Sequence, residues 1–70
     1  MNIEESVTAA INYHRSGALT EALRLYREIL DVQPDHALVL QLLGWLHYQE
    51  KRYDEAILCY RRLLLNNAGN

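Results

Sequence analysis

Three histidines and one cysteine are the side chains here that most readily do chemistry near neutral pH. His14, His36 and His47 lie far apart, and none belongs to a His-Glu-x-x-His or Cys-x-x-Cys motif. Cys59 is the only cysteine, so no disulfide can form within the chain, and no base is evident beside it. The three glycines are isolated, which gives no phosphate-binding loop. The sequence therefore predicts no catalytic residue, no metal ligand, no cofactor and no enzymatic activity.

Length and composition narrow the class of protein further. Seventy residues allow one small domain, and half of them are apolar, which argues against disorder. Seven basic and nine acidic residues leave a net charge of −2, without the positive patch that nucleic acid requires. No apolar run approaches the ~20 residues of a membrane span, and the acidic start does not resemble a secretion signal. We expect a soluble cytoplasmic protein with no nucleic-acid or membrane partner.

The sequence repeats itself with a period of 34 residues. Small and apolar residues recur at the same places, as a packed repeat requires. The shift places residues 21–23 (EAL) on 55–57 (EAI), 26–27 (YR) on 60–61 (YR), and 29–30 (IL) on 63–64 (LL).

Apolar residues recur at helical spacing in both halves of the first copy. Ser16-Gly17 breaks the run, and Thr20 is a suitable N-cap for a second helix that Pro34 ends. Asp35 is the expected cap of the next helix.

The second copy repeats this plan. One helix covers about residues 36–49, residues 50–52 form a loop, and Asp54 caps a last helix that frays from Asn66. No segment alternates with period two, so no strand is expected. The sequence predicts an all-α fold of four antiparallel helices in two tandem helix-turn-helix hairpins.

These residues resemble the tetratricopeptide (TPR) repeat, whose pattern is W-x2-L-G-x2-Y, then A-x3-F, then P. The resemblance covers about residues 3–68, with one repeat at 3–36 and the other at 37–70. The matching residues are Tyr13, Ala22, Tyr26 and Pro34 in the first copy, and Leu40, Leu43, Gly44, His47, Ala56 and Tyr60 in the second. His47 takes the place of the usual Tyr and is expected to be a packed core histidine.

The resemblance implies a superhelix of stacked hairpins, with a concave groove lined by the first helix of each repeat. Proteins of this family mostly bind peptides or partner proteins, or self-assemble. The groove residues implied here are Val7, Ile11, His14, Leu38, Gln41, Trp45, Tyr48 and Gln49. One subclass of the family grips chaperone C-terminal tails with Lys, Asn and Asn at the positions of Val7, Ile11 and Leu42. None of these three side chains can hold a carboxylate, so a chaperone tail is not an expected partner.

The implied groove is apolar and aromatic, which favours an apolar helix or peptide segment anchored by Trp45. The alternative is that Trp45 is a core residue in a differently rotated helix. His14 is expected to line the groove, where it can tune binding near neutral pH.

The last helix carries an apolar stripe but has no following helix to cover it. We expect self-association into a homodimer or higher oligomer through this end, unless the chain was cut from a longer array. The residues concerned are Ile57, Leu58, Tyr60, Leu64 and Leu65. Three functions stay open: a partner-binding module, a self-assembling scaffold unit, and an N-terminal docking segment of a larger enzyme such as a bacterial glycosyltransferase.

Overall fold

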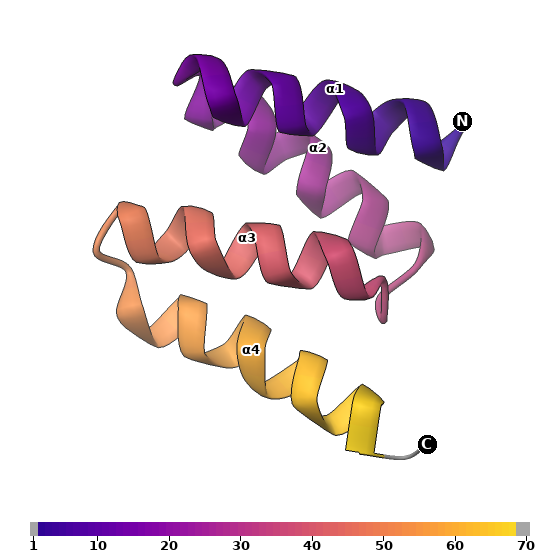
Figure 1. Cartoon of the computed structure of the whole chain (residues 1–70), viewed down its shortest axis with the longest axis vertical. Helices are drawn as coiled ribbons and strands as arrows, with labels where there is room; N and C mark the ends of the chain where they lie inside the picture. The colour runs from indigo at the N-terminus through magenta and orange to yellow at the C-terminus, as the bar shows by residue number, and fades with distance from the viewer. Residues whose placement is uncertain (1, 69–70) are drawn as a thin grey trace. The chain divides into compact units, whose positions relative to one another are not determined.

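The computed structural model describes residues 2–68, and the surroundings of side chains as far as residue 65. Within this range the chain forms four α-helices and no strand (Figure 1). The helices are α1 (Ile3–Ser16), α2 (Leu19–Val32), α3 (Ala37–Gln49) and α4 (Tyr53–Ala68). The prediction of an all-α fold built from helical hairpins is confirmed.

The chain divides into two compact units, Met1–Pro34 and Asp35–Asn70. In the first unit α1 packs against α2, and in the second α3 packs against α4. The two helices of each unit run in opposite directions (Figure 1). Each unit is therefore one helical hairpin.

The N-caps of α1 and α3 lie at equivalent positions of the repeat and accept the same kind of hydrogen bond. Asn2 Oδ1 accepts a hydrogen bond from the backbone N–H of Glu5 at 3.2 Å. Thirty-four residues further on, His36 Nδ1 accepts from the N–H of Val39 at 3.3 Å. The prediction of Asp35 as this cap is wrong, because the helix begins at Ala37 and the residue directly before it, His36, is the N-cap.

The two hairpin turns also share one geometry. Gly17 has φ 88°, and Lys51, its counterpart in the second copy, has φ 62°. The next N–H in each turn reaches back five residues, from Ala18 to Tyr13 at 2.9 Å and from Arg52 to His47 at 2.8 Å. This bond closes a Schellman motif, which requires one residue in the left-handed region.

These tight turns explain why the second helix of each hairpin begins earlier than expected. The hydrogen-bonded ladders begin at the carbonyls of Ala18 and Arg52, which accept from Ala22 at 3.1 Å and Ala56 at 3.0 Å. Thr20 and Asp54 consequently lie inside the first turn, and neither is the N-cap that the sequence suggested. Asp54 still stabilises the helix there, because a carboxylate in the first turn faces the positive end of the helix dipole.

Small residues allow the paired helices to approach closely. Ala10 of α1 and Ala22 of α2 are completely buried, as are Tyr26 and Ile29. In the second unit, a Cβ added at Gly44 would lie only 2.9 Å from Cζ of Tyr60. The position needs glycine because the ring of Tyr60 occupies the space that a Cβ would fill.

Candidate functional site

Helix α3 has two different faces and carries no Asp, Glu, Lys or Arg. One face is buried and consists of Val39, Leu40, Leu43, Gly44, Leu46 and His47. The opposite face is exposed: Leu38 is 46% accessible, Trp45 55% and Tyr48 60%, and Gln41 and Gln49 are exposed on the same side. Surface helices normally present charges to water, so an exposed face without charge indicates an interaction surface. The alternative that Trp45 is a core residue does not agree with its exposure.

This face continues onto the start of α4. The rings of Tyr48 and Tyr53 meet edge to face, with their centroids 5.5 Å apart and their planes at 65°. Tyr53 is itself 50% accessible. The sequence pattern did not mark Tyr53 as a site residue, although Tyr53 aligns with Leu19 and follows directly on the loop. We define the α3 face as Leu38, Gln41, Trp45, Tyr48 and Gln49, with Tyr53 at its edge.

The groove residues expected on α1 lie in different surroundings. Val7 is only 8% accessible, and Ile11 and His14 are half-buried. His14 Nδ1 lies 3.0 Å from the hydroxyl of Tyr26, and the two rings meet edge to face at 6.0 Å. His14 thus joins α1 to α2. The roles of these three residues in binding stay predictions.

Tyr26 has the most altered ionisation among the described side chains with a resolved shift. Its side chain is fully buried, and burial disfavours the phenolate, which raises its pKa to about 12. The neutral hydroxyl is therefore the form that faces His14 at physiological pH.

Cys59 and His47 are buried, as their expected packing roles require. Cys59 is 8% accessible, and its burial raises the pKa of the thiol and keeps it protonated. His47 is 4% accessible, and its Nδ1 lies 3.1 Å from Oε2 of Glu55 on α4. Arg52 lies 3.8 Å from the same carboxylate oxygen. This cluster joins α3 to α4 beside the turn of the second hairpin.

The second candidate surface is the exposed side of α4, which is rich in large apolar residues. Ala56 and Cys59 face inward, whereas Ile57, Leu58, Tyr60, Leu64 and Leu65 are between 36% and 68% accessible. Three of the equivalent positions in the first copy are more covered: Leu23 and Leu30 are half-buried, and Tyr26 is fully buried where Tyr60 is 36% accessible. The other two carry the exposed charges Arg24 and Asp31. The position of Tyr26 and Tyr60 is thus interior in one unit and surface in the other.

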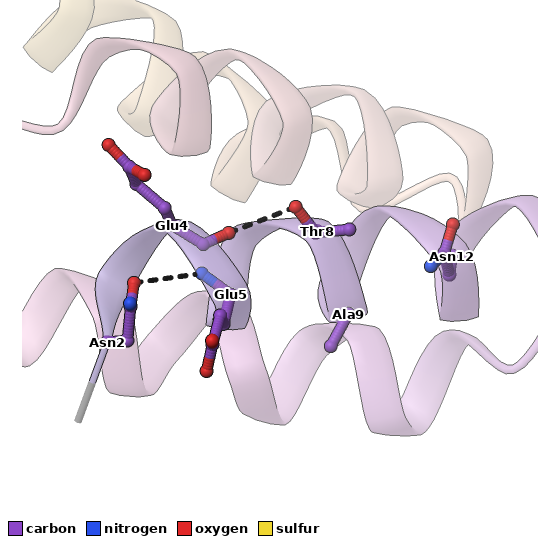
Figure 2. A pocket seen from close by; sticks show the side chains of 6 residues that line it. All are labelled: Asn2, Glu4, Glu5, Thr8, Ala9 and Asn12. Atoms are coloured by element: carbon purple, nitrogen blue, oxygen red, sulfur yellow. Dashed lines mark hydrogen bonds between the residues drawn. The ribbon is translucent and has the colours of Figure 1, made fainter.

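The outer side of α1 is a third, polar surface. A shallow hollow there is lined by Asn2, Glu4, Glu5, Thr8, Ala9 and Asn12 (Figure 2). Figure 2 also shows that two of these side chains are used within the helix, where Asn2 caps it and the Thr8 hydroxyl donates to the carbonyl of Glu4 at 3.0 Å. This surface is polar, whereas the exposed side of α4 is apolar.

Neither a metal centre nor a membrane span is found in the part of the chain that the structure describes. No three His, Cys, Asp or Glu side chains among these residues group in a way that could hold a metal ion. None of the helices there has the length and apolarity needed to cross a bilayer.

Comparison with known proteins agrees with the helical-hairpin architecture. A family model described as Tetratricopeptide repeat matches residues 13–70, which is most of the chain. The chain therefore belongs to the tetratricopeptide repeat family, whose members are typically non-catalytic protein-interaction modules. Comparison with curated proteins and with solved structures gave no match.

Proposed function

We propose that this protein is an interaction module that binds an apolar helix or peptide segment of a partner protein through the α3 face. The observation that carries the proposal is the exposure of Trp45, which is 55% accessible on a helix without a charged residue. Tryptophan is the residue type most enriched at the energetic centre of protein interfaces. The amides of Gln41 and Gln49 lie on the same side and can hydrogen-bond the polar edge of a bound segment.

The test is direct binding of a defined peptide. The probe is a fluorescently labelled peptide that forms an amphipathic helix with one leucine-rich side, and a scrambled peptide of the same composition is the comparison. Fluorescence anisotropy measures the Kd. We expect the helical peptide to bind more tightly than the scrambled one, and Trp45→Ala to weaken its binding more than tenfold.

A matched variant controls for the loss of any exposed aromatic ring. Tyr13 on α1 is 41% accessible and lies outside the α3 face. Tyr13→Ala should leave the Kd within about twofold, and circular dichroism should show both variants folded. Equal losses in the two variants, or equal binding of the two peptides, would overturn the proposal.

We also propose that the exposed side of α4 is a self-association surface. It carries five large apolar side chains that are 36% to 68% accessible on one helix, and a surface of this kind marks an interaction site or an aggregation hazard. Light scattering after size exclusion, with reductant to exclude oxidation of Cys59, measures the mass. We expect the wild type to exceed one chain at high concentration and Leu64→Glu to remain at one chain. The control is Val32→Glu on α2, a position that is 60% accessible and should leave the mass unchanged.

A further inference from the structure

At three equivalent positions the two copies of the repeat carry different kinds of side chain. In α3, Val39, Leu43 and Leu46 are at most 5% accessible. The equivalent residues of α1 are Glu5, Ala9 and Asn12, of which Glu5 and Asn12 are exposed. The positions that bury apolar side chains in the second copy are therefore polar or small in the first.

This difference matters for how two chains can join. A head-to-tail assembly would bring the apolar side of α4 onto the outer side of α1 in the next chain. That contact would desolvate the Glu5 carboxylate and the Asn12 amide against leucine and isoleucine side chains, which is costly without compensating hydrogen bonds. The α1 surface is consequently a poor partner for α4, whereas α4 itself is a good one.

We propose that α4 binds α4 of a second copy in an antiparallel pair about a two-fold axis, giving a closed dimer. This inference rests on the proposed self-association and specifies its partner and geometry. Tyr53, Ile57, Tyr60 and Leu64 follow one another at spacings of four, three and four residues, so they form one stripe along the helix. With the axis between Ile57 and Tyr60, the stripe meets itself: Tyr53 lies opposite Leu64 of the second copy, and Ile57 opposite Tyr60.

The charges beside the stripe select the antiparallel direction. Asp54 and Arg61 are both exposed, and because they are seven residues apart they lie on the same flank of the stripe. An antiparallel pair brings Asp54 of each copy next to Arg61 of the other, which makes two symmetric ion pairs. In a parallel pair this flank would face the opposite flank of the other helix, so Asp54 and Arg61 would form no ion pairs across the interface.

The apolar stripe is large enough for a weak dimer. Its four side chains, Tyr53, Ile57, Tyr60 and Leu64, are between 36% and 68% accessible. At about 200 Å² of full surface each and about half exposed, they present roughly 400 Å² per partner, which is the size of a small, transient interface. A second copy is the occupant whose shape and charge this side of α4 matches by its own symmetry.

The test measures mass by light scattering across a dilution series, with reductant. For the wild type we expect the mass to level off at twice the chain mass of 8.2 kDa. Asp54→Arg and Arg61→Asp should each weaken the dimer about tenfold, because each turns two attractions into two repulsions. The double variant Asp54→Arg/Arg61→Asp should return to within about threefold of the wild type.

A variant on α1 separates the closed dimer from head-to-tail growth. Ala9→Arg should leave the dimer unchanged, since α1 takes no part in it. A mass that keeps rising past two chains, or a loss of association in Ala9→Arg, overturns the two-fold geometry while self-association stands. If the double variant dimerises as weakly as the single variants, the antiparallel register is overturned. A single-chain mass at every concentration overturns both this inference and the proposed self-association, and leaves peptide binding at the α3 face unaffected.

Discussion

Gly17 and Lys51 adopt the same left-handed backbone at the same place in the repeat, but only one of them is suited to it. Glycine has no Cβ and enters this region without steric strain, whereas other L-residues do so at a cost of roughly 1–2 kcal/mol. The first turn thus has its preferred residue, and the second has lysine at φ 62°. The second hairpin holds a strained turn that the first does not.

Exchanging residue types at these two positions should change stability in opposite directions. Gly17→Ala should lower the free energy of unfolding by about 1 kcal/mol, entirely through the backbone, because a Cβ at this position meets nothing within 4 Å. Lys51→Gly should raise it by about 0.5 kcal/mol, because the relieved strain exceeds the added chain entropy. Urea unfolding followed by circular dichroism measures both. A loss of stability in Lys51→Gly would show that its backbone is not strained.

Tyr26 should make stability depend on pH in the alkaline range. The phenol of the unfolded chain loses its proton near the ordinary pKa of 10.0, whereas the folded chain keeps it until about pH 12. Between these values the unfolded state binds fewer protons, so raising the pH favours unfolding. The stabilising contribution is complete below pH 10 and is lost between pH 10 and about 12, a loss on the order of 2 kcal/mol.

The measurement is the free energy of unfolding in urea below pH 10 and near pH 12. The control is Tyr26→Phe, which keeps the ring and all other tyrosines but has no proton to lose. The wild type should lose stability relative to this variant as the pH rises. Parallel pH profiles for the two proteins would contradict the assignment to Tyr26.

At the scale of helices, the contact between α3 and α4 depends on one missing methyl group. Gly44→Ala gains about 1 kcal/mol of helix propensity but forces the ring of Tyr60 aside, which costs about 1–3 kcal/mol. We expect a net loss of about 1 kcal/mol in the wild-type background. In a Tyr60→Ala background the same change should be stabilising by about 1 kcal/mol.

A double-mutant cycle measured by urea unfolding gives the coupling between the two positions. The expected coupling is about 2 kcal/mol, the difference between the two backgrounds. An identical effect of Gly44→Ala in both backgrounds would mean that Tyr60 moves aside without cost.

The sequence predicted the presence and type of all four described helices but misplaced three of their N-caps. Thr20, Asp35 and Asp54 are all good capping residues, yet each stands one or two positions from the actual boundary. Capping propensity is a local preference, and here the Schellman turns and the His36 cap fix the boundaries instead. The 34-residue register held a better signal, since the Asn2 cap shifted by one repeat falls on His36.

The candidate site was predictable in part, for a related reason. Trp45 and Tyr48 could be placed on an exposed face because helical spacing separates them from the buried Leu43 and Leu46. Tyr53 could not, because its ring reaches Tyr48 only through the geometry of the Lys51 turn. The bond between His14 and Tyr26 was equally hidden, since it joins two helices whose relative rotation no local pattern specifies.

At the scale of the whole molecule, the two hairpins share their turns and caps but not their surfaces. The second unit carries both candidate interaction surfaces, the α3 face and the apolar side of α4. The outer side of the first unit is polar around Glu5 and Asn12. The repeat in the sequence therefore preserves the turns and caps that form each hairpin. It does not preserve the surface residues that would bind a partner.

The polar α1 surface has a consequence for protein engineering. Although the two copies share a period, a gene that encoded them in the reverse order would place Glu5 and Asn12 where the present sequence has the buried Val39 and Leu46. Such a shuffled chain would bury a carboxylate in an apolar environment and should be less stable than the natural order. The two repeats of this protein are therefore not interchangeable modules.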